Sequence, residues 1–468
     1  MEDIVTVILA AGKGTRMKSD IVKVLHPLLG LPMLSYSIEL SLSGIKAEKT
    51  IVVVGYQADR IQEMFKGIPI EFALQKEQLG TGHAVLQAIP FLHEFSGSVL
   101  ILCGDVPLVK VETLHSFIDT YKENESTLSV LTAVVEEPFG YGRILRNPEG
   151  WLEKIVEEKD ATEEERTIRE INTGIFCVKA PFLKEGLREI GKENAQGEYY
   201  LTDLAEIAKK NALRCSAHIV ADPMEVMGIN TRVDLAVANE KLRLEKLKEL
   251  MLSGVTVVDP KNTYVEKMVE VGKDTIIYPY CILQGKTKIG EHCIIEHNSK
   301  ISDSTVGDEV TIRSNSVITE SKVEDQASIG PFALLRPLSE VRTKAKIGNF
   351  VEVEESIIGR GSQVNHLAYI GDSFLGEEVT IGAGTITSNY NGFEKHQTIV
   401  SDRVFVGSNV ELVAPVKVGS NSSIGAGATI TKNVPEGVLA ISRVKQKNIK
   451  GWSKKMELHR KKSRDKKD

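Results

Sequence analysis

Residues 322–353 read KVEDQASIGPFALLRPLSEVRTKAKIGNFVEV, and an aliphatic residue recurs at every sixth position of this stretch. An α-helix repeats about every 3.6 residues and a strand every two, so neither explains a period of six. A six-residue repeat is typical of a parallel β-helix, in which each side of the coil contributes one inward aliphatic side chain before a tight corner. The aliphatic positions are Val323, Ile329, Leu335, Val341, Ile347 and Val353.

The same register extends from Val271 to Ile430, interrupted by occasional five-residue steps, and it predicts a coil over residues 254–442. Several of the aliphatic residues precede glycine, as in Ile289-Gly290, which suits corners that leave no room for a Cβ atom. Residues 382–398, GAGTITSNYNGFEKHQT, are too polar and glycine-rich for regular turns of the coil. We therefore expect an inserted loop there, and inserted loops on rigid scaffolds often carry function.

Residues 1–230 follow a different pattern, in which apolar strand-like runs alternate with amphipathic stretches. This alternation predicts a Rossmann-like α/β domain, with a parallel sheet and crossover helices. Leucines among Glu and Lys before Gly254 predict a linking helix over residues 231–253, and residues 443–468 form a C-terminal arm and basic tail. In the first domain, strands are expected at Val5–Ala10, Thr50–Val54, Ser98–Cys103 and Thr127–Val135, and helices near Met33–Leu42, Ala58–Phe65 and Val111–Tyr121.

The overall composition is that of a globular protein of two or three domains, with 468 residues, 42% of them hydrophobic and 26% charged. Lys and Arg number 58 against 64 Asp and Glu, and the resulting net charge of −6 argues against a nucleic-acid-binding protein. From Lys454 onward the chain is strongly basic and lacks an apolar period, so we expect a solvated, disordered tail.

Targeting and redox signals are absent from the sequence. The first residues, MEDIVTVILAAGKGTR, are unlike a signal peptide, and no apolar run approaches the roughly 18 residues of a membrane helix. We therefore expect a cytoplasmic protein without membrane insertion. The 5 cysteines are scattered and never form a CxxC pair, which excludes a disulfide framework and a structural zinc site.

A glycine-rich loop directly follows the first predicted strand. Residues 9–17 read LAAGKGTRM, and the small residues among Leu9, Ala10, Ala11 and Gly12 let backbone N–H groups approach an oxyanion. The loop is neither a Walker A motif nor a G-x-G-x-x-G fingerprint, so alone it indicates phosphate only weakly. Arg16 and Lys23 add two cations that could neutralise a triphosphate.

The strings LAAGKGTRM and KVLHPL resemble the sugar nucleotidyltransferases, in which this loop holds the nucleotide phosphates. The resemblance implies that Gln75, Gly80 and Thr81 of QKEQLGTGH read a uracil edge with an amide and backbone groups. It also implies that Asp105 of CGDVP and Asn230 of GIN hold Mg²⁺, an ion that prefers oxygen ligands. The implied sugar-binding residues are Gly142, Glu157, Asn172, Tyr200 and Thr202.

From about Val5 to Trp452 the chain resembles the bacterial bifunctional N-acetylglucosamine-1-phosphate uridyltransferases and glucosamine-1-phosphate N-acetyltransferases. The motifs GPFALLRP, HLAYIGD and GAGT carry the resemblance in the coil. It implies a left-handed coil, a homotrimer, and His366 as general base on an amine. The implied acceptor contacts are Arg336, Tyr369, Asn389 and Lys395, and the implied acetyl-CoA contacts are Ala383, Asn389, Tyr390, Ser408, Ala426 and Arg443.

The implied chemistry has two steps with small-molecule substrates. Acetyl-CoA acetylates glucosamine 1-phosphate, with an oxyanion held by a backbone N–H near Ala383. The product's phosphate oxygen then attacks the α-phosphorus of UTP and expels pyrophosphate, while Mg²⁺ on Asp105 and Asn230 absorbs charge together with Lys23 and Arg16. The two steps make UDP-N-acetylglucosamine, a precursor for bacterial cell-wall peptidoglycan and lipopolysaccharide.

Two positions depart from the family pattern near the acceptor phosphate. Glu354 stands where the family has a lysine, and Thr380 stands where it has an asparagine. A carboxylate about 4 Å from a phosphate costs on the order of a few kcal/mol at an effective dielectric near 20. Three interpretations remain open: Lys344 or Lys346 supplies the missing cation, the acceptor is another amino sugar 1-phosphate, or acetyl transfer is weak.

Two rival functions also remain open. In the first, the chain is a uridylyltransferase whose coil only oligomerises it. Glu354 favours this alternative, whereas His366 together with Asn389 and Arg443 disfavours it. In the second, it is a non-catalytic nucleotide-binding subunit, which the intact Lys23, Asp105 and Asn230 disfavour.

Overall fold

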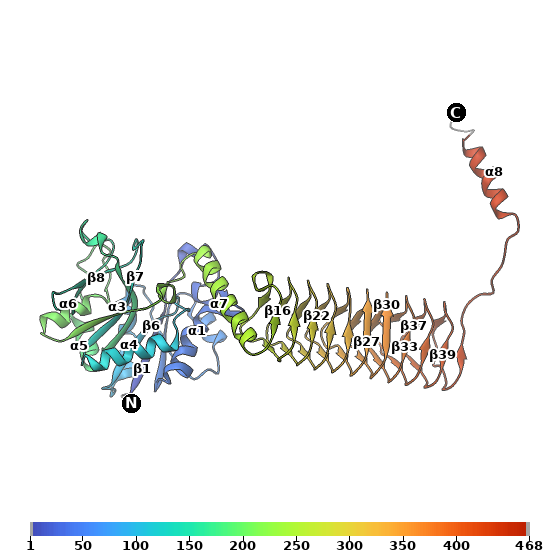
Figure 1. The fold of residues 1–468 in the computed structure, drawn as a ribbon, viewed down its shortest axis with the longest axis horizontal. Helices are drawn as coiled ribbons and strands as arrows, with labels where there is room; N and C mark the ends of the chain where they lie inside the picture. The colour runs from blue at the N-terminus through green and yellow to red at the C-terminus, as the bar shows by residue number, and fades with distance from the viewer. Residues whose placement is uncertain (1–2, 465–468) are drawn as a thin grey trace. The chain divides into compact units, whose positions relative to one another are not determined.

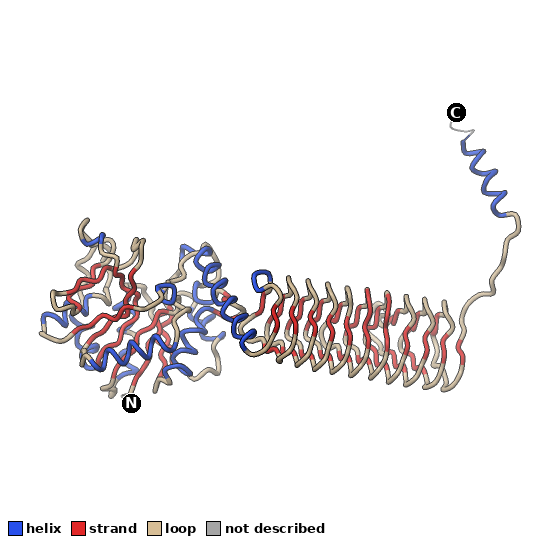
Figure 2. Tube along the Cα trace, in the orientation of Figure 1, coloured by secondary structure: helices blue, strands red, loops and turns tan. Residues whose placement is uncertain are grey.

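The computed structural model describes residues 3–464. The chain divides into two compact units, residues 1–245 and 246–468. Figures 1 and 2 show that helices and strands alternate in the first unit, whereas the second is built mainly from short strands. Each unit has its own hydrophobic core.

The first unit is built on a nine-stranded sheet whose main path has the order β11-β7-β10-β6-β1-β4-β5. Strand β1 runs parallel to β4 and β6, as expected, but β10 runs antiparallel to both β6 and β7. The prediction of a parallel sheet is therefore wrong at β10. The chain enters β10 through the antiparallel pair β8 and β9, and an antiparallel neighbour needs no crossover helix. The strands are β1 Ile4–Ala10, β4 Lys49–Val54, β5 Glu71–Leu74, β6 Ser98–Cys103, β7 Leu128–Val134, β8 Arg143–Arg146, β9 Leu152–Val156, β10 Glu170–Lys179 and β11 Cys215–Ile219, with a small separate pair, β2 Pro27–Leu28 and β3 Leu31–Pro32.

Both faces of this sheet are buried, because successive side chains of β1 enter two different cores. Val7 packs with residues of α3, α5 and α6, and Ile8 packs with residues of α1, α2 and α4. The predicted helix at Met33–Leu42 is shorter than expected, since α1 gives way to a π-helical turn over Leu40–Ile45. The helices are α1 Met33–Glu39, α2 Ala58–Met64, α3 Thr81–Leu86, α4 Val111–Glu123, α5 Ala180–Glu189 and α6 Asp203–Lys210.

Helix α7, Arg232–Leu252, follows the α/β sheet and leads into the coil. Its start is held by a reciprocal cap, in which Asp234 accepts from the Thr231 amide at 2.8 Å and Thr231 Oγ1 accepts from the Asp234 amide at 3.2 Å. Gly254 follows the helix with φ +98°, a conformation that favours glycine.

The second unit is a coil with three sides. Successive strands belong in turn to an eleven-, a ten- and a nine-stranded sheet, and every strand pair in these sheets is parallel. Ile329, Leu335 and Val341 illustrate the pattern, because each is the buried residue of its strand. This architecture is consistent with the predicted left-handed parallel β-helix.

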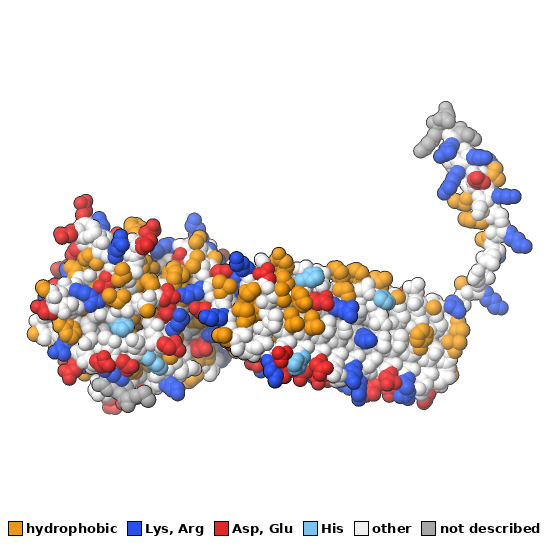
Figure 3. Space-filling view, in the orientation of Figure 1, with side chains coloured by type: hydrophobic (Ala, Val, Ile, Leu, Met, Phe, Trp, Pro, Cys, Tyr) orange, Lys and Arg blue, Asp and Glu red, His pale blue; other side chains and the backbone are white. Residues whose placement is uncertain are grey.

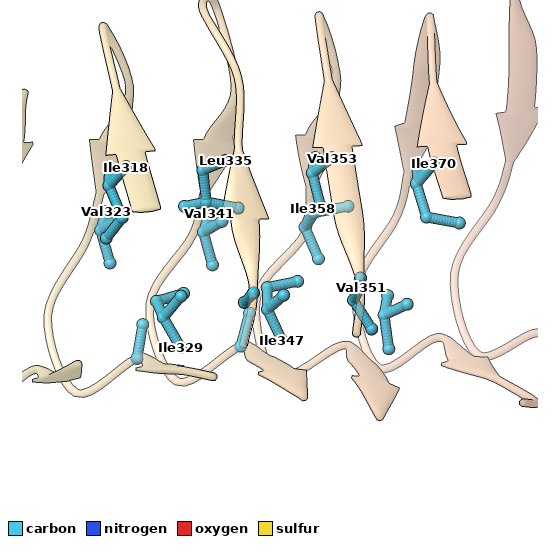
Figure 4. Packing of buried hydrophobic residues seen from close by; sticks show 14 of the residues in the cluster. Ile318, Val323, Ile329, Leu335, Val341, Ile347, Val351, Val353, Ile358 and Ile370 are labelled. Atoms are coloured by element: carbon cyan, nitrogen blue, oxygen red, sulfur yellow. The ribbon is translucent and has the colours of Figure 1, made fainter. Parts of the chain in front are cut away.

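The coil is held together by stacked aliphatic side chains. Figure 4 shows Ile318, Leu335, Val353 and Ile370 in one row, with further rows made by the other two sides. All four are fully buried, and burial of such a side chain is worth roughly 1.5–3 kcal/mol. At a corner, a Cβ atom added to Gly348 would lie 1.9 Å from the carbonyl oxygen of Asn365, so the next coil requires glycine there.

The strands of the coil are two to four residues long. The eleven-stranded sheet contains β12 Thr256–Val257, β15 Ile276–Ile277, β18 Ile294–Ile295, β21 Thr311–Ile312, β24 Ser328–Ile329, β27 Lys346–Asn349, β30 Gln363–His366, β33 Thr380–Ile381, β36 Phe405–Val406, β39 Ser423–Ile424 and β41 Leu439–Ala440. The ten-stranded sheet contains β13 Tyr264–Val265, β16 Ile282–Gln284, β19 Lys300–Ser302, β22 Val317–Thr319, β25 Leu334–Leu335, β28 Glu352–Glu354, β31 Tyr369–Gly371, β34 Ile386–Ser388, β37 Glu411–Val413 and β40 Thr429–Ile430. The nine-stranded sheet contains β14 Glu270–Val271, β17 Lys288–Ile289, β20 Thr305–Val306, β23 Lys322–Val323, β26 Glu340–Val341, β29 Ile357–Ile358, β32 Ser373–Leu375, β35 Thr398–Val400 and β38 Val416–Val418.

The expected insertion at residues 382–398 is smaller than predicted. Residues Ile386–Ser388 form the regular strand β34, and only residues 389–397 leave the coil. The inward residue of β34 is Thr387, which is fully buried. Its hydroxyl accepts from the Gly371 amide at 2.8 Å and donates to the Gly371 carbonyl at 3.1 Å, so a polar side chain fits inside the coil.

The prediction of a disordered tail from Lys454 onward is wrong for residues 454–464, which lie in helix α8, Trp452–Arg464. The segment is rich in strong helix formers, namely Lys, Arg, Glu, Met and Leu. This composition favours a helix even though the segment lacks an apolar stripe. The helix side chains are exposed, as expected, and Figure 3 shows Lys and Arg along it. Residues 465–468 of the predicted tail lie outside the described residues. Across residues 3–464, no helix has the length and apolar character needed to cross a membrane.

Candidate active sites

The predicted phosphate loop lies at the carboxyl end of β1, where ligands bind in open α/β sheets. Strand β1 contains Leu9 and ends at Ala10, and Ala11 and Gly12 begin the loop. A Cβ atom at Gly12 would meet nothing within 4 Å, so the backbone there is open to a ligand. Gly14 instead has φ +63°, and a Cβ atom on it would lie 2.5 Å from Lys23 Cβ.

Four predicted residues form one cluster around Lys23 and Asn230. Lys23 forms an ion pair with Asp105 and donates to Asn230 Oδ1 at 2.9 Å. Arg16 donates to the same Asn230 oxygen at 2.9 Å. The Lys23 side chain is 12% exposed, so its charge is partly shielded from water. The structure thus brings together cations and oxygen ligands that lie up to 214 positions apart in sequence.

The backbone holds the two oxygen ligands in place. Asp105 follows the end of β6, and its carbonyl accepts from the Ile229 amide at 2.9 Å, which ties the segment before α7 to the sheet. The Asn230 amide donates to Asp234 at 2.9 Å. Asn230 is therefore held by the same carboxylate that caps α7.

These residues fit the Mg²⁺ ion that the resemblance implies. The side-chain oxygens of Asp105 and Asn230 both approach one cationic group, the Lys23 ammonium, and carboxylate and amide oxygens are suitable Mg²⁺ ligands. Within residues 3–464 there is no cluster of three or more His, Cys, Asp or Glu arranged to hold a metal. A magnesium ion at Asp105 and Asn230 would therefore take its remaining ligands from substrate phosphates and water.

The predicted base-reading residues form a second cluster. Gln75 is 3% exposed, and its Nε2 donates to the Gly80 carbonyl at 3.2 Å and approaches His83 Nδ1 at 3.1 Å. A carbonyl can only accept, so the amide group is oriented with Oε1 as the acceptor that it offers to a ligand. Thr81 Oγ1 accepts from the Leu201 amide at 3.1 Å. Sequence reasoning missed His83, although it ends the quoted QKEQLGTGH string.

The predicted sugar-binding residues are also neighbours. Thr202 donates to Glu157 Oε1 at 3.1 Å, and the Asn172 amide donates to the Gly142 carbonyl at 2.9 Å. A Cβ atom on Gly142 would lie 3.4 Å from Asn172 Cβ and 3.5 Å from Glu157 Oε2, so Gly142 lies beside both of these side chains. Burial raises the pKa of Glu157, and the Thr202 hydrogen bond opposes that rise. The neighbouring Tyr200 is 6% exposed.

In the coil, His366 is held by a residue that sequence reasoning did not select. His366 ends β30, and its Nδ1 lies 2.6 Å from Oδ1 of Asn349 at the paired position of β27. Because an amide oxygen only accepts, Nδ1 carries the proton and Nε2 keeps a lone pair for use as a base. The available signal was the GNFVE motif that contains Asn349.

The predicted acceptor contacts converge on Glu354, the last residue of β28. Its carboxylate accepts from the Tyr369 hydroxyl at 2.8 Å, from Arg336 at 3.3 Å and from Lys395 at 3.4 Å. Asn389 joins the cluster by donating to the Tyr369 hydroxyl at 3.3 Å. The hydrogen bond from Tyr369, followed by the charges of Arg336 and Lys395, lowers the pKa of Glu354 despite partial burial.

The lysines considered as replacement cations lie elsewhere on the coil. Lys346 is on β27 of the eleven-stranded sheet, whereas Glu354 is on β28 of the ten-stranded sheet. Among residues 3–464, the cations within 4.0 Å of Glu354 are Arg336 and Lys395, so neither Lys344 nor Lys346 contacts it. Thr380, the second departure, begins β33 beside β30, the strand of His366.

Most of the predicted acetyl-CoA contacts follow one corner of successive coils. The Ala383 carbonyl accepts from the Asn409 amide at 2.7 Å, and the Ser408 carbonyl accepts from the Gly427 amide at 2.8 Å. Arg443 reaches back to donate to the Ala426 carbonyl at 2.8 Å. Tyr390 lies in the loop of residues 389–397, where its side chain is 62% exposed.

Comparison with known proteins identifies both halves of the chain. The profile of the MobA-like NTP transferase domain matches residues 6–171, and the six-repeat profile of the bacterial transferase hexapeptide matches residues 268–303, 287–320 and 397–432. The bifunctional protein GlmU of Geobacter metallireducens is 52% identical over 97% of this chain and 99% of its own length. The proteins of the same name from Geotalea uraniireducens and Geobacter sulfurreducens are 49% and 50% identical, each over 97% of this chain and over 100% and 98% of their own lengths.

The chain belongs to the GlmU family. This confirms the family, the fold class and the bifunctional transferase predicted from the sequence. GlmU membership disfavours the interpretation as a non-catalytic nucleotide-binding subunit, and it favours an enzymatic coil over a pure scaffold. Within this GlmU-family chain, Glu354 remains the residue whose position the predicted acceptor chemistry does not explain.

Proposed function

We propose that this chain is a cytoplasmic enzyme that makes UDP-N-acetylglucosamine from glucosamine 1-phosphate, acetyl-CoA and UTP. Uridylyl transfer belongs to residues 1–230 and acetyl transfer to residues 254–442, with residues 231–253 as the linking helix and 443–468 as the C-terminal arm. The observation that carries the proposal is the cluster beside the phosphate loop, in which Lys23 pairs with Asp105 and shares the Asn230 side-chain oxygen with Arg16.

The uridylyl step depends on placement and charge. Backbone N–H groups of the loop after β1 hold the UTP phosphates, while Lys23 and Arg16 align and neutralise them. A Mg²⁺ ion, when bound to Asp105 and Asn230, supplies additional neutralisation of the triphosphate. A phosphate oxygen of N-acetylglucosamine 1-phosphate forms the new bond to the α-phosphorus, and pyrophosphate leaves. Gln75, Gly80 and Thr81 bind the uracil, and Gly142, Glu157, Asn172 and Thr202 bind the sugar.

The acetyl step uses the exposed imidazole of His366. Its Nε2 takes a proton from the amino group of glucosamine 1-phosphate as the nitrogen attacks the thioester carbonyl. The new C–N bond forms, and a backbone N–H near Ala383 stabilises the oxyanion. The C–S bond then breaks, and the proton held on His366 Nε2 passes to the leaving sulfur, which releases coenzyme A as its thiol. The acceptor is held by Arg336, Tyr369, Asn389 and Lys395, and acetyl-CoA by Ala383, Asn389, Tyr390, Ser408, Ala426 and Arg443.

We also propose that three coils associate into a homotrimer. Phe332, Phe350 and Leu367 stand at equivalent corners of successive coils and are 50%, 55% and 62% exposed. The two phenyl rings stack with centroids 5.3 Å apart. An exposed apolar ladder of this kind is suited to contact with another copy of the coil. Sedimentation equilibrium should give a mass three times that of the 51.5 kDa chain. A monomer at micromolar concentration would refute the trimer.

The two activities are tested separately on the full chain. With acetyl-CoA and glucosamine 1-phosphate, free thiol should appear, and His366→Ala should abolish that signal but spare pyrophosphate release. With UTP, Mg²⁺ and N-acetylglucosamine 1-phosphate, pyrophosphate should appear, and Asp105→Ala should abolish it but spare thiol release. If the wild type released no thiol, the acetyl step would be refuted, and if it released no pyrophosphate, the uridylyl step would be refuted.

Because Glu354 contacts the predicted acceptor-binding residues, galactosamine 1-phosphate should be tested as an alternative acceptor in the same assay. A thiol signal with galactosamine 1-phosphate and none with glucosamine 1-phosphate would reassign the acceptor. No signal with either, beside intact pyrophosphate release, would make the coil a scaffold.

A further inference from the structure

Glu354 occupies the centre of an anion-binding site formed by Arg336, Tyr369 and Lys395. Its side chain is 17% exposed, and its oxygens accept from the Tyr369 hydroxyl, the Arg336 guanidinium and the Lys395 ammonium. Such a set of one hydroxyl and two cations is what binds a phosphate group. In this chain, the Glu354 carboxylate already accepts hydrogen bonds from all three of these donors.

The surroundings of this site are net negative. Arg336 also pairs with Glu352 at 3.0 Å, and Lys395 also pairs with Glu355 at 3.3 Å and Asp372 at 3.6 Å. Two cations thus face four carboxylates when Glu354 is included. A phosphate dianion that enters must take Arg336 and Lys395 from carboxylates that already hold them.

We propose that Glu354 determines acceptor specificity by acting as an internal competitor for the phosphate of the acceptor. The inference rests on the proposed acetyl transfer, because it assumes that Arg336, Tyr369 and Lys395 bind the acceptor. A phosphorylated amino sugar binds only by displacing the Glu354 carboxylate from these groups. An amino sugar without phosphate does not have to displace this carboxylate. Glu354 therefore reduces the advantage in affinity that a phosphorylated acceptor would otherwise have over an unphosphorylated one.

The geometry makes the competition direct. Tyr369 and Arg336 approach the same oxygen, Glu354 Oε2, while Lys395 approaches Oε1. If the carboxylate became an amide, which is neutral and has a single acceptor oxygen, the ion pairs with Arg336 and Lys395 would be lost and the three donors would be held less strongly. Removal of one like charge at hydrogen-bond distance is expected to strengthen phosphate binding at least about tenfold.

The test compares Glu354→Gln with a matched control, Glu355→Gln, in the full chain. Glu355 is the next residue and also contacts Lys395, but it makes no contact with Arg336 or Tyr369 among the described interactions. For each protein, kcat and KM are measured with glucosamine 1-phosphate and with glucosamine, at saturating acetyl-CoA. Binding of glucosamine 1-phosphate without acetyl-CoA is measured in parallel by isothermal titration calorimetry.

We expect Glu354→Gln to lower both KM and Kd for glucosamine 1-phosphate at least about tenfold, with kcat/KM for glucosamine changed less than twofold. Glu355→Gln should change each value less than about threefold. An unchanged or weaker affinity of Glu354→Gln for glucosamine 1-phosphate would overturn the proposal, because Glu354 would then support the cations rather than compete. If the wild type releases no thiol with any acceptor, acetyl transfer fails, but the calorimetric comparison still decides whether Glu354 competes with phosphate.

Discussion

Nδ1 of His366 lies 2.6 Å from Oδ1 of Asn349, which occupies the paired position on the neighbouring strand of the coil. This hydrogen bond fixes the ring orientation and the tautomer that leaves Nε2 free of a proton. Asn349→Ala should lower kcat for thiol release about 10- to 100-fold with little change in the KM for acetyl-CoA. Asn349→Asp should shift the acid limb of the pH profile to higher pH, since a carboxylate stabilises the protonated ring. An unshifted limb in Asn349→Asp would show that Asn349 does not act on the base.

Lys23 should be needed for uridylyl transfer and dispensable for acetyl transfer. Lys23→Met removes the cation that Asp105 and Asn230 both contact, and we expect pyrophosphate release to fall at least about 100-fold. Thiol release serves as the internal control for folding. Lys66→Met, at a lysine that is 77% exposed, should leave both rates unchanged. Retention of more than a tenth of the uridylyl activity in Lys23→Met would contradict the proposed role.

His83 should control how Gln75 presents its amide group. His83→Leu removes the ring nitrogen 3.1 Å from Gln75 Nε2, so the amide can rotate and offer the wrong group to the base. We expect the KM for UTP to rise about 3- to 10-fold, with kcat nearly constant and poorer discrimination against CTP. His93→Ala, at an exposed histidine, is the control. Unchanged discrimination in His83→Leu would assign His83 to packing alone.

The stability of the coil should depend on which side of a strand is truncated. Leu335 and Leu334 are neighbours on β25, but Leu335 is fully buried and Leu334 is half-buried. Leu335→Ala should lower the free energy of unfolding by about 2–5 kcal/mol, and Leu334→Ala by about 1 kcal/mol or less. Urea unfolding followed by circular dichroism measures both. Equal losses would contradict the assignment of the inward side.

Asp203, at the start of α6, should make the first unit more stable as pH falls. Burial raises the pKa of Asp203 to about 6. A carboxyl group with a raised pKa in the folded state favours folding below its unfolded pKa, near 4, and this contribution is lost as pH rises through 6. Asp203→Asn should therefore be more stable than the wild type by up to about 2 kcal/mol at pH 7.

The difference between Asp203→Asn and the wild type should shrink as pH falls from 7 to 4.5. Asp59→Asn, at an exposed carboxylate in the first turn of α2, controls for the general effect of losing a charge. Chemical unfolding at several pH values gives the comparison. A stabilisation that is constant with pH would show that Asp203 titrates normally.

The period of the coil was readable from the sequence because it is a local property. Each side takes about six residues, so Val323, Ile329 and Leu335 reveal the inward positions without knowledge of any distant contact. Thr387 lies six positions after Ile381 and fits the same register, but its polarity led to the prediction of a loop. Its burial depends on hydrogen bonds to Gly371 one coil away, which the local sequence does not reveal. The antiparallel course of β10 was missed for a similar reason, since strand direction depends on long-range pairing.

The sequence by itself determined the two-part architecture, the phosphate loop and the residue types of both sites. Only the tertiary structure decided what each charged group meets. Lys23 and Asn230 lie 207 positions apart and still share a hydrogen bond, because the sheet and the cap of α7 bring them together. Glu354 was expected to repel a phosphate, and the fold adds that its carboxylate already holds Tyr369 on the next coil. Periodicity and helix or strand propensity are local properties that can be read from the sequence. Hydrogen bonds and ion pairs form between residues that only the completed fold places side by side.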